Sequence, residues 1–345
     1  MTSAGQENTI RSRPSPNCCL CGQPGKRLYE GTRDWIFDAP GQWNFDICAN
    51  PDCGLVWLNP MPLEEDIAKA YQTYYTHQAS RTLANRVVQY VKTGYLATRY
   101  GYCAGTVPPL QKCLGLLAYL ALFRRAGLDF LVAYLQALPR GRLLDVGCGD
   151  GQIVQFMQNL GWQAEGVDFD PGAVDNAVRK GLRIHLGTLQ SQAYPENSFE
   201  AIVMSHFLEH IHEPAELLAE CHRILKPGGR LVVLTPNIGS WGHEKFQGCW
   251  RGLEPPRHLH IFNSRSLNRL ALRTGFRKVI VNTTLRNGGK ILLASRAIRR
   301  TGRFNPYARR DLLSRLWVTA MQLVEWTIWK LNPDRGEELD MIAEK

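Results

Sequence analysis

The stretch that decides the fold is Leu143-Leu144-Asp145-Val146-Gly147-Cys148-Gly149-Asp150-Gly151. An apolar run ending in Asp145 predicts a buried parallel strand, and the glycines allow a sharp turn in which the backbone approaches a ligand closely. Residues 152–160 follow with apolar side chains at helical spacing. A second short strand, residues 164–167, precedes Asp168, whose carboxylate can accept both hydroxyls of a nucleoside ribose. Turn, second strand and acid together predict a site for a nucleoside-containing cofactor.

The chemistry of the turn separates it from dinucleotide-binding turns. A dinucleotide fingerprint has the order G-x-G-x-x-G and cradles a pyrophosphate. Here the order is G-x-G-x-G, and Asp145 at the strand tip would repel phosphates. A carboxylate there suits a cationic amino-acid group instead, as in S-adenosylmethionine (SAM), which carries an ammonium, a sulfonium and a ribose.

Four further motifs follow in order along the chain. They are Gly166-Val167-Asp168-Phe169-Asp170-Pro171, Asn197-Ser198-Phe199-Glu200-Ala201-Ile202-Val203, Leu208-Glu209-His210 and Leu225-Lys226-Pro227-Gly228-Gly229-Arg230-Leu231. With them, residues 139–283 resemble the class I SAM-dependent methyltransferases. The resemblance implies an α/β, Rossmann-like sheet of seven strands, the last one antiparallel. It also implies a set of cofactor-binding residues: Asp145, Gly147, Cys148, Gly149, Gly151, Asp168, Phe169, Thr188, Leu189, Ser205 and His206.

Four cysteines near the start of the chain have the spacing of a metal site. Cys18 and Cys21 form one pair and Cys48 and Cys53 a second, with 26 residues between the pairs. Thiolate pairs at turns suit a four-sulfur zinc site, which is structural because four protein ligands close it. The alternative is a set of reduced cysteines in a small β-rich module. With Tyr71, Tyr74 and Tyr75 downstream, this region resembles the zinc-binding domain ahead of methyltransferase domains in sugar, glycan and secondary-metabolite pathways.

The acceptor side is predicted from two segments. Methyl transfer is an in-line displacement, so the enzyme aligns the acceptor and, where required, removes its proton. His206, His210 and His258 are the candidates for this base, although a Glu-His pair such as Glu209-His210 is often structural in the family. Residues 250–262 resemble the substrate loop of the same subfamily and supply the candidate substrate-binding residues Trp250, Arg257, His258 and His260. The alternative is that Arg257 and His258 only hold the loop in place.

Composition limits the class of protein. The chain has 345 residues, 44% of them hydrophobic, and ten cysteines, and no stretch resembles a signal peptide or a membrane span. We therefore expect a cytoplasmic enzyme with reduced cysteines. The expected segments are a disordered tail (1–16), a zinc ribbon (17–80), a helical linker or cap (81–138), the SAM-binding core (139–283), a basic and amphipathic helical insertion (284–335) and a final strand (336–345).

The net charge of +10 is concentrated late in the chain. Residues 286–315 hold nine basic residues against the single acid Asp311, and residues 311–331 are rich in tryptophan and leucine. Apolar helices beside clustered arginines are typical of helices that lie on an anionic membrane surface, here the inner face. The alternatives are a solvated basic loop and helices that pack on each other or form a homodimer.

The leading prediction is a methyltransferase that uses SAM and Zn²⁺ and acts on a small, sugar or lipid-linked acceptor. An RNA methyltransferase, which would use the basic block to hold phosphates, is less favoured because the charge lies beside apolar helices. A membrane-surface scaffold without turnover is the non-enzymatic alternative.

Overall fold

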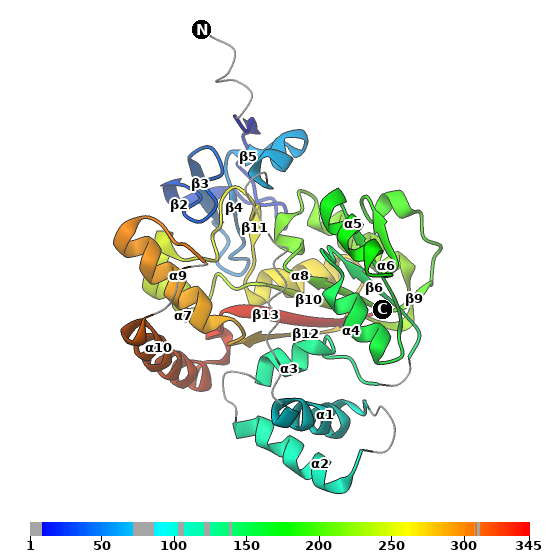
Figure 1. The fold of residues 1–345 in the computed structure, drawn as a ribbon. Coiled ribbons are helices and arrows are strands. Elements are labelled where there is room, and N and C mark those ends of the chain that lie inside the picture. Colours follow the sequence, from blue (N-terminus) through cyan, green and yellow to red (C-terminus); the bar gives the residue numbers. More distant parts are fainter. Residues whose placement is uncertain are drawn as a thin grey trace. The chain divides into compact units, whose positions relative to one another are not determined.

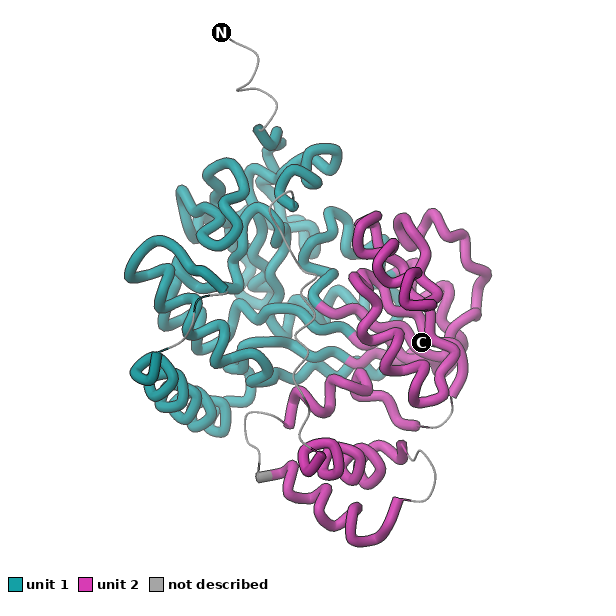
Figure 2. The backbone as a smooth tube through the Cα atoms, viewed as in Figure 1, with its two compact units in different colours: residues 1–75, 206–218, 233–341 teal, residues 76–205, 219–232, 342–345 magenta. Residues whose placement is uncertain are grey.

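The computed structural model describes residues 9–71, 86–102, 107–120, 125–137, 140–306, 308 and 311–345. They form two compact units, coloured separately in Figure 2. The first unit comprises residues 1–75, 206–218 and 233–341, and the second comprises residues 76–205, 219–232 and 342–345. The units do not follow the linear segments expected from the sequence, because the N-terminal module falls in the same unit as residues 233–341.

The second unit holds the glycine turn (Figure 1). Its strands are β6 (Arg142–Val146), β7 (Gln163–Asp168), β8 (Ile184–Leu186), β9 (Phe199–Ser205) and the first part of β10 (Leu225–Pro236). Its helices are α1 (Arg86–Tyr100), α2 (Pro109–Gly115), η2 (Leu116–Leu120), α3 (Arg125–Leu131), α4 (Gln152–Asn159), α5 (Pro171–Arg179), η3 (Gln190–Gln192) and part of α6 (Pro214–Ile224).

The central strand of this unit is β6, which is buried on both faces. Strand β6 pairs in parallel with β7 on one side and with β9 on the other, and its leucines are completely buried. A strand covered on both faces is rich in apolar residues, as Leu143, Leu144 and Val146 are in β6. Asp145 lies opposite Gly166 of β7 and Val203 of β9. The carboxyl ends of these strands therefore meet at one edge of the sheet.

Helix α5 shows how local sequence places the second acid. Asp170 caps the helix by accepting hydrogen bonds from the backbone N–H groups of Gly172 and Ala173, and Pro171 occupies the first turn. Both features favour a helix start at this residue. The helix thus begins three residues after Asp168, which ends β7.

The first unit contains the N-terminal module and the later part of the chain. Its strands are β1 (Ser12–Arg13), β2 (Gly25–Thr32), β3 (Trp43–Cys48), β4 (Val56–Leu58), β5 (Met61–Pro62), β11 (His260–Ile261), β12 (Arg277–Thr284) and most of β13 (Glu338–Glu344). Its helices are η1 (Glu64–Tyr71), η4 (Leu208–His210), α7 (Trp241–Phe246), η5 (Gln247–Cys249), α8 (Ser264–Arg273), α9 (Gly288–Thr301), α10 (Leu312–Leu331) and η6 (Pro333–Arg335).

A four-stranded sheet links the N-terminal module to the predicted substrate loop. Its order is β11-β4-β3-β2, and β11 pairs antiparallel with β4, with His260 opposite Trp57. The strands of the cysteine-rich module are therefore completed by a strand from residues 250–262. The sequence did not predict this pairing.

The large sheet has the order β12-β13-β10-β9-β6-β7-β8. At the start of β10, the N–H of Gly228 donates to the carbonyl of Lys345 (3.2 Å), and at its end the N–H of Asn237 donates to the carbonyl of Glu337 (3.0 Å). Strand β13 therefore runs antiparallel to β10. Seven strands with the last antiparallel confirm the Rossmann-like methyltransferase sheet expected from the sequence.

One local expectation differs from the structure. Residues 9–16 are ordered where a disordered tail was expected, because β1 pairs with β5 and the Arg11 side chain forms an ion pair with Asp66 (2.7 Å). Within the helical segment, α3 ends at Leu131, and Ala133 and Tyr134 take positive φ angles that a helix does not allow. Tyr74, Tyr75, Arg309 and Arg310 lie outside the described residues.

Candidate active site

The glycine turn after β6 packs tightly against β7. The N–H of Gly147 donates to the carbonyl of Val167 (2.8 Å), and the N–H of Gly149 donates to Oδ2 of Asp168 (2.7 Å). Gly149 has a φ of 53°, and a Cβ added there would meet no atom within 4 Å. The turn thus leaves open space beside a backbone whose conformation favours glycine.

Two carboxylates lie at this turn. Asp145 is 1% exposed, and its Oδ1 has no hydrogen-bond partner among the described residues. Burial, and then the charge of Asp168, raise the pKa of Asp145 to about 8. A buried carboxylate beside a second acid is destabilised when charged, unless a cation or hydrogen-bond donors compensate it. The two acids therefore fit a ligand that carries a positive charge and hydroxyl groups, as SAM does.

The other predicted cofactor residues lie at or just after the carboxyl ends of strands β6, β7, β8 and β9. Cys148 and Leu189 are buried, Phe169 and Thr188 are exposed, and Ser205 ends β9. The exit of β8 lies beside β7, since the N–H of Gly187 donates to the carbonyl of Asp168 (2.9 Å). The hydroxyl of Thr188 accepts a hydrogen bond from the N–H of Ser191 (3.2 Å).

His206, in the first unit, stands between two carboxylates. Its Nδ1 lies 3.3 Å from Oε1 of Glu209, and its Nε2 lies 3.2 Å from Oε1 of Glu338. Desolvation would lower its pKa, but the charges of Glu338 and Glu209 outweigh it and raise the pKa of His206 to about 9. Nε2 of His206 also lies 3.0 Å from Nη2 of Arg286, so the ring contacts a guanidinium as well as two carboxylates.

His210 and His258 form a pair of imidazoles in contact, with ring centroids 4.8 Å apart. Nδ1 of His210 donates to the carbonyl of Arg257 (2.9 Å), and Nδ1 of His258 donates to the carbonyl of Gly252 (2.8 Å). The pKa of His258 is lowered to about 4, mainly by burial, although Glu254 opposes the shift. The side chain is therefore neutral at physiological pH and keeps a lone pair on Nε2.

Arg257 is completely buried and paired with two acids. Its Nη1 donates to Asp34 (2.8 Å) and to the carbonyl of Ala70 (3.0 Å), and its Nε donates to Glu254 (3.1 Å). Glu254 and Asp34 outweigh the effect of burial and raise the pKa of Arg257. These contacts support the alternative in which Arg257 holds the loop, rather than a clamp on an acceptor.

Trp250 and His260 are also buried and have protein partners. Nε1 of Trp250 donates to Oε2 of Glu337 (3.0 Å), and Nδ1 of His260 donates to the carbonyl of Ile211 (3.1 Å). Both side chains are thus held by protein partners, and their part in acceptor binding stays a prediction. Of the four residues predicted for substrate binding, His258 is the one that the structure brings together with the other candidate bases, through its contact with His210.

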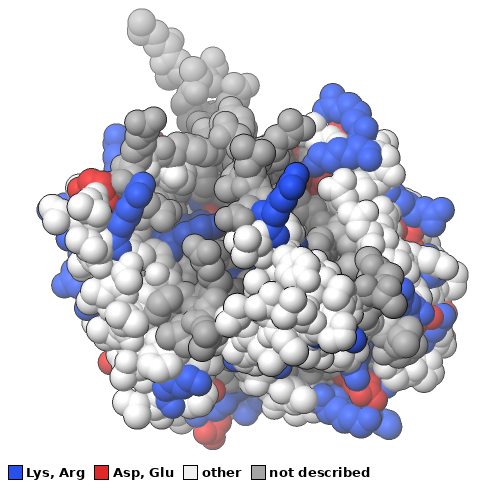
Figure 3. Space-filling view, turned by 60° about the horizontal axis from the view of Figure 1, so that its bottom comes forward, with Lys and Arg blue, Asp and Glu red and all other residues white. Residues whose placement is uncertain are grey.

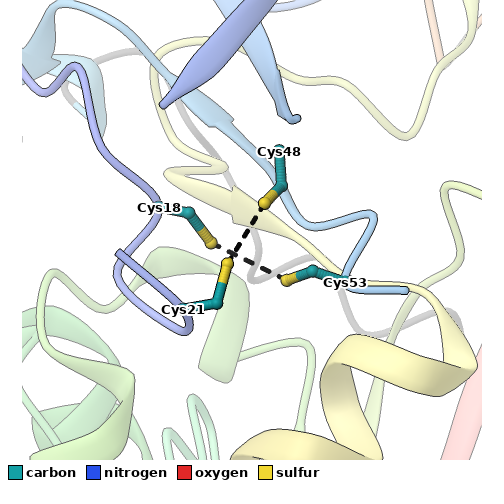
Figure 4. Close-up of side chains that lie close together, drawn as sticks. All are labelled: Cys18, Cys21, Cys48 and Cys53. Atoms are coloured by element: carbon teal, nitrogen blue, oxygen red, sulfur yellow. Dashed lines mark hydrogen bonds between the residues drawn. The ribbon is translucent and has the colours of Figure 1, made fainter. Parts of the chain in front are cut away.

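The four predicted cysteines converge in the first unit (Figure 4). Sγ of Cys18 lies 3.7 Å from Sγ of Cys53, and Sγ of Cys21 lies 3.3 Å from Sγ of Cys48. Thiolates at about 2.3 Å from a tetrahedral zinc ion stand about 3.8 Å apart, whereas a disulfide bond measures about 2.05 Å. The donor set and its spacing therefore fit a zinc ion. Cys19 is exposed and belongs to neither pair.

Three acids around the candidate histidines and Arg257 were not predicted. Glu338 raises the pKa of His206, and Glu254 raises that of Arg257. Asp34, from the N-terminal module, forms an ion pair with Arg257. Glu338 begins the last strand, and no spacing in the sequence relates it to His206. These groups meet through tertiary packing alone.

Comparisons with known proteins agree with this fold. Residues 118–281 match a family model described as a methyltransferase domain. A ubiquinone biosynthesis O-methyltransferase from Xanthomonas oryzae pv. oryzae is 37% identical over 117 residues, which are 32% of this chain and 48% of that protein. One from Alkalilimnicola ehrlichii is 31% identical over 117 residues, which are 32% of this chain and 47% of that protein. The chain thus spans about half the length of these curated relatives.

Among solved structures, a SAM-dependent methyltransferase from Archaeoglobus fulgidus aligns over 66% of this chain and 94% of its own, with 19% identity and a TM-score of 0.43. Residues 118–281 thus match a methyltransferase domain, and the strand order of the large sheet is the one expected for that fold.

Proposed function

We propose that this chain is a SAM-dependent methyltransferase that transfers a methyl group to an oxygen atom of a small amphipathic acceptor, such as a sugar or a lipid-linked glycan. The observation that carries the proposal is the buried pair of carboxyl groups of Asp145 and Asp168 at a glycine turn, where Oδ1 of Asp145 has no donor among the described residues and its pKa is raised. SAM, when bound, supplies a methyl group on a sulfonium. Asp145 compensates the positive charge of the amino-acid group, and Asp168 accepts the ribose hydroxyls.

The acceptor side of the proposal rests on the histidines. His206 lies among charged groups, with Glu209, Glu338 and Arg286 in contact with its ring, whereas His258 offers a neutral imidazole with a lone pair on Nε2. Such a cluster orients an acceptor and favours loss of its proton. Oxygen is favoured as the atom methylated because the matching relatives are named O-methyltransferases.

Helix α10 supports an acceptor held at a membrane surface. The structure describes no helix that is both long and apolar enough to cross a bilayer. Yet α10 exposes large apolar side chains, with Leu313 75% and Leu331 83% exposed, and Arg315 lies on the same helix. On the face seen in Figure 3, Lys and Arg side chains are spread around wide uncharged areas. An amphipathic helix with basic neighbours binds anionic lipid through burial of its apolar side chains and through charge.

The cysteine site completes the proposal. A zinc ion bound by Cys18, Cys21, Cys48 and Cys53 would have no open coordination position, so its role is to hold the module together.

Binding of SAM and methyl transfer test the function. Calorimetry with SAM should give binding to the wild-type protein and at least tenfold weaker binding to Asp168→Ala, with the circular dichroism spectrum unchanged. Mass spectrometry of small molecules and lipids from cells with and without the protein should then reveal an acceptor that gains 14 daltons. Equal SAM affinity in both proteins would remove Asp168 from the ribose site, and a protein that binds a nicotinamide nucleotide but not SAM would refute the function.

Flotation with vesicles tests the membrane proposal. The protein should float with vesicles that contain phosphatidylglycerol and not with pure phosphatidylcholine, and Leu313→Ser with Leu316→Ser should reduce flotation severalfold. Salt-sensitive retention of RNA without flotation would favour an RNA substrate instead.

A further inference from the structure

A second group of metal-ligand side chains lies in the first unit, apart from the cysteines. Glu209, His210 and His258 each offer one ligand atom, and these atoms all lie within 4.8 Å of one another. None of them belongs to the cysteine site. The three residues come from η4 and from the loop before β11, so the fold joins segments that are almost fifty residues apart.

The two histidines are oriented in the way that metal ligands are. A carbonyl oxygen only accepts hydrogen bonds, so Nδ1 of each ring must carry a proton where it faces the carbonyls of Arg257 and Gly252. A ring whose proton is on Nδ1 in this way can offer its other nitrogen, Nε2, to a metal ion. Metal-bound histidines are typically fixed by such a hydrogen bond from the second ring nitrogen to a carbonyl or carboxylate.

Glu209 supplies the anionic oxygen. Its side chain is completely buried, and Oε2 accepts a hydrogen bond from the hydroxyl of Thr235 (3.0 Å). Oε1 lies 3.3 Å from Nδ1 of His206, within ion-pair distance. A buried carboxylate is stabilised by cations beside it, and a metal ion would add to this pairing.

We propose that Glu209, His210 and His258 bind a divalent first-row transition-metal ion. Two imidazole nitrogens and one carboxylate oxygen suit Zn²⁺, Fe²⁺, Co²⁺ or Mn²⁺, and three protein ligands leave positions open for other ligands. This step rests on the proposed function: a hydroxyl oxygen of the acceptor would bind at an open position of the metal ion. The metal would make the proton of that hydroxyl easier to remove. The cluster would then activate the acceptor through the ion rather than through an imidazole alone.

Cobalt provides the test, because thiolate ligands give Co²⁺ an intense near-ultraviolet charge-transfer band that nitrogen and oxygen ligands do not. The full chain is stripped with a chelator and reloaded with Co²⁺, and bound metal is counted by mass spectrometry of the elements. We expect the wild-type protein to bind one cobalt ion beyond the number that the thiolate band accounts for. Glu209→Gln and His210→Asn should each lose that ion and keep the thiolate band unchanged.

His260→Asn is the matched control. His260 is equally buried and also donates from Nδ1 to a backbone carbonyl, but it lies outside the cluster. This variant should keep the extra ion. A wild-type protein with no cobalt beyond the thiolate-bound ion overturns the proposal, whatever the variants do, and so does an extra ion that survives in both cluster variants. Metal binding without methyl transfer would refute the proposed function and leave the metal site standing. Methyl transfer by a protein that binds no extra ion would refute the metal site and leave the proposed function standing.

Discussion

Asp145 and Asp168 place two carboxyl groups at one turn, and their surroundings differ. The backbone N–H of Gly149 compensates Asp168, whereas Oδ1 of Asp145 has no donor among the described residues. A neutral side chain at Asp145 would make the protein without ligand more stable. The charged residue therefore has a reason to be there only if a cation binds.

Asp145→Asn tests this reasoning through pH. The pKa of Asp145 is raised from 3.8 to about 8, so the folded protein holds a proton that the unfolded chain releases in this range. The stability of the ligand-free protein should therefore fall as pH rises from about 4 to 8, and the asparagine variant should lack this part of the decline. Removal of a charged partner weakens binding by about 1.5–3 kcal/mol, or roughly ten- to a hundredfold in SAM affinity.

Melting temperatures at pH 5 and pH 8.5, with calorimetry of SAM binding, measure both effects. Asp150→Asn is the control in the same turn, because the Asp150 carboxylate faces Lys180 (3.1 Å). An Asp145→Asn protein that binds SAM as tightly as the wild type would contradict the assignment.

At the scale of elements, α10 is attached to its unit by a buried acid. Glu325 is the one buried residue on this helix, while most of its apolar side chains are half-buried or exposed. Burial and the neighbouring Glu337 raise the pKa of Glu325, and burial raises that of Glu337. A Cβ on Gly288 would approach Oε2 of Glu325 to 2.6 Å, so α9 also packs closely against this carboxyl group. The attachment of the helix therefore requires Glu325 to be protonated.

Glu325→Gln should make the protein less sensitive to alkaline pH. A carboxyl group whose pKa is raised in the folded state contributes stability below its usual pKa of 4.5, and that stability is lost as pH rises toward the raised value. Glutamine is neutral throughout, so the variant should melt a few degrees above the wild type at pH 8.5 and near it at pH 5. For a protein of this size, each kcal/mol shifts the midpoint by about 2–4 °C.

Scanning calorimetry at both pH values provides the measurement. Glu30→Gln serves as the control, since its side chain is 76% exposed. Parallel pH profiles for the wild type and Glu325→Gln would show that the carboxyl pair does not limit stability.

At the scale of the whole molecule, the sequence predicted what local patterns encode. The strand tips with Asp145 and Asp168 and the spacing of the cysteine pairs were predicted, because each depends on residues close together in the chain. The surroundings of the histidines were not. Glu338 and Asp34 reach His206 and Arg257 only through packing of distant segments, which no spacing reveals.

The pairing of β11 with β4 also arises from packing of distant segments, and it connects the cysteine-rich module to the predicted substrate loop. It joins segments about two hundred residues apart, so that the cysteine-rich module and the loop carrying His258 share one sheet. Asp34 of that module also pairs with Arg257. A metal bound by the cysteines would therefore stabilise the loop as well as the module.

Cys48→Ser should accordingly loosen two segments at once. Loss of one ligand should release zinc, and hydrogen exchange measured by mass spectrometry should increase in β3 and β4 and also in residues 250–262. Cys19→Ser is the control, because Cys19 is an exposed neighbour of the first cysteine pair. If exchange rises only within residues 17–62, the module is an independent domain and the shared sheet does not transmit its stability. If Cys48→Ser retains a full equivalent of zinc, Cys48 is not a ligand.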